Sequence, residues 1–265
     1  MDEHGLRVSR ACQVVRLSRT AHYKPPAARL ERDAPVVEAL QGVVERHTRW
    51  GFWKCFDSLR LDGHWWNHKR VHRVYRDLRL NLPRRTRRRI PRRAKQPFFA
   101  PSALNETWAM DFMQDRLHDG RRFRTFNVID ESNREGLTIE ISPSLPSVRV
   151  IAILGELIAQ HGTPARIRCD NGPEFRSLAF TRWAEEKNIE ILYIQPGKPV
   201  QNAFMERFNR SFRTEVLDAY LLEYLVDVRR VTTDWLADYN LRRPHDSLGR
   251  VPPRKFMPRH TAVEV

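Results

Sequence analysis

The first third of the chain shows apolar positions that recur every three or four residues, the spacing of amphipathic helices. Three helices are predicted between residues 33 and 80: one capped by Asp33, one from Phe52 to near Gly63, and one that follows Asn67 as its cap. Residues 1–24 predict two shorter helices around Leu17–Ser18, which would suit half of a helix-turn-helix, and 25–33 predict a linker.

From residue 107 the pattern changes to apolar runs and alternation, which are typical of strands. Three strands in succession, followed by helices and strands in turn, predict an α/β fold: a mixed five-stranded sheet with helices on both faces. The predicted strands and helices are 107–117, 123–131, 136–142, 147–161, 165–170, 177–188, 189–196, 201–217 and about 224–240. The core domain is expected at 101–245, with 246–265 as a C-terminal tail.

Charge divides the chain at the same place as the hydrophobic pattern. Residues 1–98 hold 24 Lys and Arg against 9 Asp and Glu, whereas residues 99–265 hold 23 of each, so the first part carries the whole net charge of +15. Such concentrated positive charge favours a nucleic-acid partner over a basic surface that serves only solubility. We therefore expect residues 25–82 to form a helical DNA-binding domain.

The candidate DNA contacts of this part lie on the helix "HKRVHRVYRDLRL" and on the segment "PRRTRRRIPRRAK" that follows it. The helix has an apolar face that begins at Val71 and a basic opposite face, while the segment has two prolines and no apolar period, as expected of an extended arm. An arm of this kind can lie along phosphates without sequence preference. The predicted contacts are Lys69, Arg70, Arg73 and Arg76 on the helix, and Arg84, Arg85, Arg87, Arg88, Arg89, Arg92 and Arg93 in the linker arm, 83–100.

Other residue types exclude several classes of protein. The spacings of Cys12, Cys55 and Cys169 suit neither a disulfide framework nor a zinc site, and His68 and His72 have ligand spacing but no matching Cys pair. The longest apolar stretch, "VIAILGELIA", is too short to span a bilayer, and no signal peptide is recognisable. The expected location is the bacterial cytoplasm, in association with the nucleoid, with no membrane partner.

Three carboxylates of the second part are candidates for chemistry. Asp111 lies within the apolar strand "WAMDFM", Asp170 ends the strand "ARIRCD", and Glu206 lies on the polar face of the helix that begins near residue 201. Each has an ordinary alternative role: a solvated strand residue, an Asp-Asn-Gly turn, and an i,i+4 pair with Arg210.

Taken together, the three carboxylates predict a site for divalent cations. The first and fourth predicted strands are expected to be neighbours, and the helix that carries Glu206 can pack across them. Mg²⁺ prefers oxygen ligands, and two such ions can clamp a phosphodiester between an attacking and a leaving oxygen. Two Mg²⁺ or Mn²⁺ ions per site are therefore expected.

The spacing of these residues resembles that of a known family. The spacing is similar to the D-D-35-E triad of DDE transposases and retroviral-type integrases, since Asp170 and Glu206 follow Asp111 with 35 residues between the last two. Several sequence motifs resemble the second-reading-frame product, OrfB, of IS-three-family insertion-sequence transposases. They are "WAMDFM", "FRTFNVID", "RCDNGPEF", "IQPGKPVQNAFMERFNR" and "YNLRRPHDSL". The resemblance extends from about residue 5 to residue 257.

The resemblance implies an RNase H-like core that cuts and joins DNA strands with the help of metal ions held by the triad. It also implies that Arg213 contacts DNA near the reacting end, with Arg210 beside it, and that Asn171 and Gly172 shape the loop next to Asp170. The expected partners are transposon ends and target DNA, further copies of the chain on that DNA, and an upstream-frame product, OrfA, as fusion or partner. No zipper heptads and no retroviral zinc module are recognisable.

Two other functions are compatible with these residues. A nuclease of the same fold would cut DNA without joining it, and a transposon-derived regulator would bind DNA without chemistry. Strand-transfer products would distinguish the transposase from the nuclease, and metal-dependent nicking would exclude the regulator.

Overall fold

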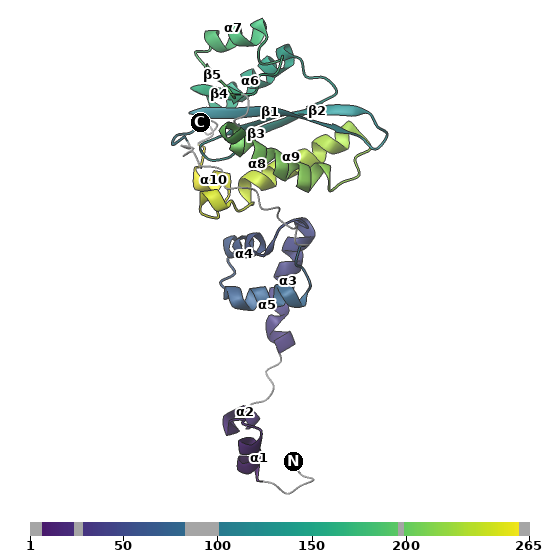
Figure 1. Cartoon of the computed structure of the whole chain (residues 1–265), viewed down its shortest axis with the longest axis vertical. Helices are drawn as coiled ribbons and strands as arrows, with labels where there is room; N and C mark the ends of the chain where they lie inside the picture. Colours follow the sequence, from purple (N-terminus) through teal and green to yellow (C-terminus); the bar gives the residue numbers. More distant parts are fainter. Residues whose placement is uncertain (1–6, 24–28, 83–100, 196–198, 260–265) are drawn as a thin grey trace, which may run out of the picture.

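The computed structural model describes residues 7–23, 29–82, 101–195 and 199–259, arranged as a small helical unit and an α/β core (Figure 1). Two short helices, α1 (Val8–Val14) and α2 (Arg19–Tyr23), come first, as the sequence predicts. The basic arm lies outside the described residues. None of the helices in the described part of the chain is long and apolar enough to cross a membrane.

The helical unit consists of α3 (Arg29–Arg46), α4 (Phe52–Leu61) and α5 (His68–Asp77). Their apolar faces form one buried cluster, as the helical period predicts. The cluster contains Val36, Leu40, Val43, Trp50, Cys55, Phe56, Leu59, Val71, Val74 and Tyr75. Asn67 caps α5 as predicted, since its side chain accepts a hydrogen bond from the Lys69 N–H at 2.9 Å.

The predicted role of Asp33 as the cap of α3 is wrong. The helix begins four residues earlier, at Arg29, so Asp33 lies inside it. There its carboxylate is nearly buried and accepts hydrogen bonds from Arg70 at 2.9 Å and Arg73 at 2.7 Å. The pKa of Asp33 is lowered by the Arg70 hydrogen bond, against the effect of burial and with the help of Arg73. A contact between α3 and α5 therefore replaces the expected cap.

The core contains the predicted mixed five-stranded sheet, with the strand order β3-β2-β1-β4-β5. β1, β2 and β3 pair antiparallel, whereas β4 runs parallel to β1 and β5 parallel to β4. The strands are β1 (Thr107–Arg116), β2 (Arg122–Asp130), β3 (Gly136–Ser142), β4 (Arg166–Cys169) and β5 (Glu190–Tyr193). Every predicted strand is present, within a few residues of its expected ends.

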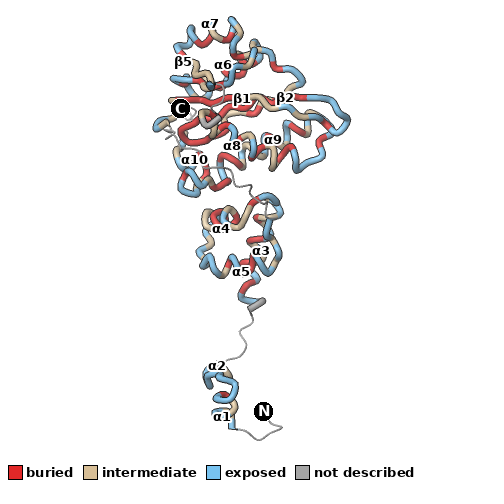
Figure 2. The backbone as a smooth tube through the Cα atoms, viewed as in Figure 1, coloured by how far each residue is buried: buried red, intermediate tan, exposed pale blue. Residues whose placement is uncertain are grey.

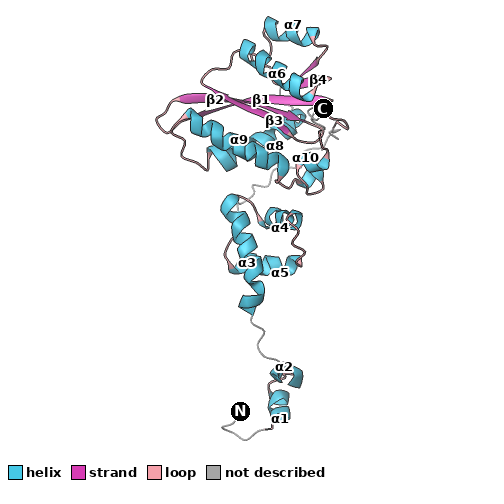
Figure 3. Cartoon of the chain, turned by 180° about the vertical axis from the view of Figure 1, so that it is seen from behind, coloured by secondary structure: helices cyan, strands magenta, loops and turns pink. Residues whose placement is uncertain are grey.

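Helices cover both faces of the sheet, and each face has its own apolar cluster (Figures 2 and 3). One face packs against α6 (Ser147–His161) and α7 (Leu178–Glu186). The other packs against α8 (Ala203–Phe212) and α9 (Leu225–Leu241). The strand period of two sends alternate residues to the two clusters: Trp108 and Met110 to the first, Ala109 to the second.

Close approach of α8 and α9 to the sheet requires a glycine at the start of β3. A Cβ at Gly136 would lie 2.5 Å from Leu236 and 2.8 Å from Phe208. The same glycine exchanges two hydrogen bonds with the Asn240 amide, at 2.9 and 2.8 Å. α8 continues directly into a π-helical turn, η3 (Arg213–Leu217). A short 3₁₀ turn, η2 (Pro199–Asn202), precedes it.

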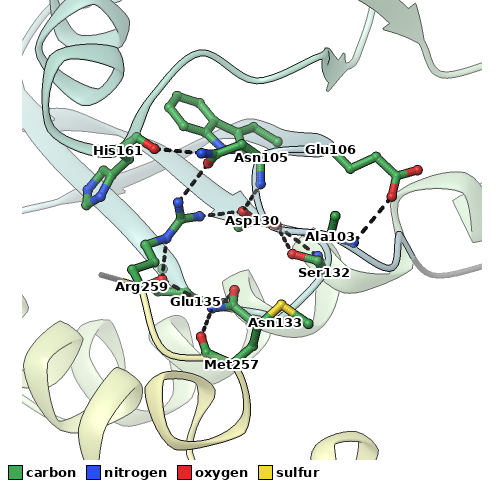
Figure 4. A network of polar contacts seen from close by, with 12 residues as sticks. Ala103, Asn105, Glu106, Asp130, Ser132, Asn133, Glu135, His161, Met257 and Arg259 are labelled. Atoms are coloured by element: carbon green, nitrogen blue, oxygen red, sulfur yellow. Dashed lines mark hydrogen bonds and ion pairs between the residues drawn. The ribbon is translucent and has the colours of Figure 1, made fainter. Parts of the chain in front are cut away.

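The end of the chain, expected to be a tail, is bonded into the core. After η4 (Asp246–Leu248) and α10 (Pro253–Phe256), the Arg259 side chain is only 8% exposed and reaches the turn between β2 and β3 (Figure 4). It donates hydrogen bonds to Asp130, to Glu135 at 2.6 Å and to Asn105 at 2.7 Å. Two segments far apart in the sequence are thereby joined.

The helical unit contacts the core through a few polar and aromatic groups. His47 at the end of α3 lies 3.7 Å from the Asp238 carboxylate on α9 and stacks on Trp50, with ring centroids 3.7 Å apart. Arg250 lies 3.4 Å from Asp57 on α4. α4 thus lies beside the segment that follows α9.

Candidate active site

Strand alternation places two of the three candidate carboxylates on one face of the sheet. Met110 and Phe112 pack into the cluster under α6 and α7, so Asp111 between them faces α8. On β4, Ile167 and Cys169 pack into that same cluster, so the side chain after them, Asp170, belongs to the α8 face as well.

The strand register brings these two carboxylates to the same level. β1 and β4 pair with Ala109 opposite Arg168, and the same register continued for two residues puts Asp111 opposite Asp170. The neighbourhood of the first and fourth strands, which the sequence predicted, is confirmed.

Hydrogen bonds hold the Asp111 carboxylate from two sides. One oxygen accepts from the Phe112 N–H at 2.8 Å, and the other accepts from the Asn209 amide on α8, also at 2.8 Å. Asn209 is itself held by Asn127, whose amide donates to its oxygen at 2.7 Å. Asn127 lies directly opposite Asp111 in the β1–β2 pairing. The sheet and α8 therefore fix this carboxylate together.

The pKa of Asp111 is raised to about 6. Burial is the main cause, and the negative charges of Asp170 and Glu206 contribute to the increase. The hydrogen bonds from Phe112 and Asn209 oppose the increase but do not cancel it. Asp111 therefore lies within the field of two other negative charges, and a bound cation would stabilise its ionised state.

The turn after β4 positions Asp170. Its carboxylate accepts a hydrogen bond from the Gly172 N–H at 2.9 Å, and the Asn171 amide donates to the Ile194 carbonyl at 2.9 Å. A Cβ at Gly172 would lie 2.9 Å from the Asp170 carboxylate oxygen. A side chain at Gly172 would therefore displace the carboxylate, and Asn171 ties the turn to the chain beyond β5.

α8 carries the third carboxylate on its exposed face, as its helical period predicts. Met205, Phe208 and Phe212 are buried against the sheet, whereas Glu206 and Arg210 are exposed. In the described part of the chain, no three His, Cys, Asp or Glu side chains are grouped closely enough to ligate one ion together. Glu206 therefore interacts with Asp111 through charge and shares no ligand cluster with it in this conformation.

Arg213 lies two turns beyond Glu206 and is bonded to β1. Its guanidinium donates to the Asp115 carboxylate at 3.0 Å and to the Gln114 carbonyl at 3.0 Å. The side chain is 39% exposed, so one face stays open to solvent. Neither partner was predicted from the sequence, which assigned Arg213 to DNA alone.

The basic face of α5 is present, but two of its four cations are engaged. Arg70 and Arg73 pair with Asp33, which partly neutralises them, while Lys69 and Arg76 are exposed and line a shallow hollow with Arg73 and the two histidines of α5. The arm residues of the predicted DNA contacts lie outside the described residues.

The roles of Asn127 and Asn209 were not foreseen from the sequence. Asn127 stands among apolar residues in "FRTFNVID" and is fully buried, although its strand pattern would suit a hydrophobic residue there. A buried amide needs a partner, and that requirement was the available signal. Asn209 was placed on the polar face of its helix, but not against Asp111.

The fold and the carboxylate-bearing face define the class of this protein, an RNase H-like integrase core. Residues 101–199 and 187–253 both match the family described as Integrase core domain. The chain is 18% identical to a simian T-cell lymphotropic virus intasome chain, with a TM-score of 0.50 over 82% of this chain and 74% of the other. This likeness concerns the fold alone.

Relatives of known origin identify the family more closely. The chain is 36% identical to the 39.2 kDa protein of insertion element IS476 from Xanthomonas euvesicatoria, over 97% of this chain and 74% of the relative. It is 34% identical to the 31.7 kDa protein of IS407 from Burkholderia multivorans, over 96% and 91%. It is 24% identical to the transposase InsD of IS2 from Escherichia coli, over 95% and 88%. The chain belongs to the insertion-sequence family of transposases with an integrase core, which confirms the expected resemblance.

Proposed function

We propose that this protein cuts and joins DNA strands at the ends of an insertion sequence, with Asp111, Asp170 and Glu206 as its catalytic carboxylates. The observation that supports this proposal is the place of Asp111 on the α8 face of an integrase-type sheet, where the continued β1–β4 register puts it opposite Asp170 and where the charges of Asp170 and Glu206 act on it. Water attacks a phosphodiester to free a 3′ hydroxyl, and that hydroxyl attacks target DNA to join the strands.

The donor set suits divalent cations. Three carboxylates supply oxygen ligands only, which Mg²⁺ and Mn²⁺ prefer, and their repulsion would be relieved by positive charge. Asp111, Asp170 and Glu206 would hold two such ions together with substrate phosphate oxygens. When bound, the ions would polarise the phosphate and lower the pKa of the attacking hydroxyl.

The surrounding side chains prepare the carboxylates for this role. Asn209 and the Phe112 N–H orient Asp111, and the Gly172 N–H orients Asp170. Because these donors are supplied by the folded chain, Asp111 and Asp170 would need little rearrangement when the substrate binds, whereas Glu206 would have to come closer to them.

DNA is the proposed partner, held by the basic face of α5, by the arm and by Arg210 and Arg213 beside the carboxylates. Asn171 would border the reacting strand. Several copies of the chain would assemble on the two ends, with an OrfA product as fusion or partner, close to the nucleoid in the cytoplasm.

A strand-transfer assay tests the proposed function as a whole. Duplex oligonucleotides that carry the terminal inverted repeat of the element are incubated with the protein, plasmid and Mg²⁺. Nicked and joined products are expected. Nicking without joining would indicate a nuclease, and binding without either product would indicate a regulator.

The arm is expected to dominate the salt dependence of DNA binding. Replacing Arg87, Arg88, Arg89, Arg92 and Arg93 with Gln removes five positive charges, and each neutralised phosphate contributes about 0.9 to the slope of log affinity against log salt. The slope should become shallower by up to about 4.5, as measured by anisotropy titrations at several salt concentrations. An unchanged slope would make the arm a linker only.

Gly172→Ala is expected to reduce strand cleavage about 10- to 100-fold with little loss of DNA affinity, because the new methyl group displaces the Asp170 carboxylate by a few tenths of an ångström or more. Gly155→Ala is the matched control, since nothing lies within 4 Å of a Cβ at that position. Cleavage and thermal unfolding are measured for both variants. Full activity of Gly172→Ala would show that the turn has room to adjust.

Arg213→Ala is expected to slow strand transfer at least about tenfold at saturating protein, and Arg213→Lys is expected to be milder, because a lysine still meets phosphate as a point charge. Overall affinity, dominated by the basic first part, should change little. Asp115→Asn separates the two roles of this side chain, since it weakens the ion pair with β1 and keeps the guanidinium. If Asp115→Asn loses as much activity as Arg213→Ala, Arg213 acts by fixing η3 to the sheet.

A further inference from the structure

A pocket of about 470 Å³ lies at the junction between the helical unit and the core. Its lining comes from the exposed face of α8, from Lys54 of α4 in the helical unit, and from the segment after α9. Its lining includes residues of both units, and Glu206 is one of them. The pocket therefore borders the candidate active site.

Cations from both units face this pocket. Lys54 of α4 is half-buried, and its side-chain ammonium makes no hydrogen bond or ion pair with any residue that the structure describes. Arg207 and Arg210 of α8 line the opposite wall, are exposed, and have no carboxylate partner within the described ranges. Arg243 also lines the pocket, but Glu215 neutralises it.

The protein by itself does not balance these charges. The pKa of Lys54 is lowered to about 8. Burial is the main cause, the positive charges of Arg243 and Arg207 contribute, and the negative charges of Glu215 and Asp246 oppose the decrease. The carboxylates of the lining are Glu206, assigned above to the metal ions, and Asp246, which is exposed at the end of the pocket. In the described structure neither carboxylate pairs with Lys54, Arg207 or Arg210, so these cations favour an anionic ligand.

We propose that this pocket binds a backbone phosphate of the DNA strand that reacts at the carboxylates, with Lys54 on one side and Arg207 and Arg210 on the other. This inference rests on the proposed function, because it takes the ligand from the DNA that the active site would cut. Phe204, which is partly exposed in the lining, would contact the attached nucleotide. The helical unit would then help to position the strand for the core.

The test is a scan with neutral phosphate substitutes. Duplexes of the terminal inverted repeat carry one methylphosphonate at a time in place of a phosphate, and their affinity is measured by anisotropy without divalent ions. The parent protein is expected to lose about tenfold in affinity at one position close to the reacting bond. Lys54→Gln is expected to bind the unmodified duplex about tenfold more weakly and to be insensitive to the substitute at that position.

Two further variants make the scan decisive. Arg207→Gln, on the opposite wall, should lose sensitivity at the same position. Lys187→Gln removes an exposed lysine at the end of α7 and should retain the full sensitivity of the parent. If Lys54→Gln still loses about tenfold in affinity when the methylphosphonate is introduced, the effects of the substitution and of the methylphosphonate are independent. That result would overturn the proposal.

A second measurement needs no variant. In lysine footprinting by mass spectrometry, Lys54 should be modified in the free protein and protected by the terminal duplex, whereas Lys187 should react equally in both states. Thymidine 5′-monophosphate at millimolar concentration should not protect Lys54. Equal protection by this mononucleotide would identify a free-nucleotide site instead, and lack of protection by the duplex would overturn the proposal.

Failure of the inference and failure of the proposed function give different results. If the parent nicks and joins DNA but shows no coupling between Lys54 and any phosphate, only the pocket is wrongly assigned. If the parent neither binds the terminal duplex nor cuts it, both proposals are overturned.

Discussion

Asp170→Asn is expected to lower metal-dependent DNA cleavage at least about a thousandfold, because it removes a charged oxygen ligand from the proposed two-cation site. The asparagine retains the size of the side chain and can still accept the Gly172 hydrogen bond, so the turn after β4 should be preserved. DNA affinity, which depends on the basic first part, should change less than about threefold. Cleavage of a terminal duplex is measured in Mg²⁺ and in Mn²⁺.

Asp119→Asn is the matched control for this result. Asp119 lies in the exposed turn between β1 and β2 and pairs only with Arg121 beside it in the described structure. Its replacement should leave cleavage unchanged. If Asp170→Asn cleaves at the parental rate in either metal, Asp170 is not a ligand, and the proposed assignment of the triad fails at that position.

Arg259→Met is expected to destabilise the core by about 3–5 kcal/mol, because it leaves two buried carboxylates without their shared partner. The Asp130 side chain is fully buried, Glu135 is 1% exposed, and Arg259 contacts both. Methionine keeps the length and the apolar volume of the arginine stem, so the loss reports the ion pairs. The free energy of unfolding is measured by urea titration.

Two variants serve as controls for the network. Lys255→Met removes an exposed positive charge of α10 and should cost less than about 0.5 kcal/mol. Adding Asp130→Asn to Arg259→Met should recover part of the lost stability, since one uncompensated charge disappears. If Arg259→Met lowers the free energy of unfolding by less than about 1 kcal/mol, the last residues contact the core but do not stabilise it.

The same network makes stability depend on pH. Burial alone would raise the pKa of Glu135, but the hydrogen bond from Arg254 and the charge of Arg259 outweigh it, and the pKa lies below its ordinary value. A carboxylate with a lowered pKa stabilises the fold above its unfolded pKa, about 4.3, and this contribution is lost as the pH falls through the folded value. The difference between the parent and Arg259→Met should accordingly shrink below about pH 4.

Local patterns were sufficient for most of the secondary structure. The strand period and the helical period each extend over a few neighbouring residues, so the five strands and the main helices could be predicted, as could the Asn67 cap. The pairing of β1 with β4 followed from the order of the elements. The start of α3 was misplaced because Asp33, a good cap in isolation, gains more from Arg70 and Arg73 across the helical unit.

The sequence by itself determined the order of the elements, the family and the three candidate carboxylates, because these depend on short patterns and motif spacing. Only the tertiary structure decided what surrounds them. The Asn209–Asp111 hydrogen bond joins residues 98 apart, and the Arg259–Asp130 pair joins residues 129 apart. Such partners are selected by the packing of whole elements and by the cost of burying an unpaired polar group. Short sequence patterns predict neither of these. The pocket at Lys54 exists for the same reason, since its two walls meet only when the helical unit lies against the core.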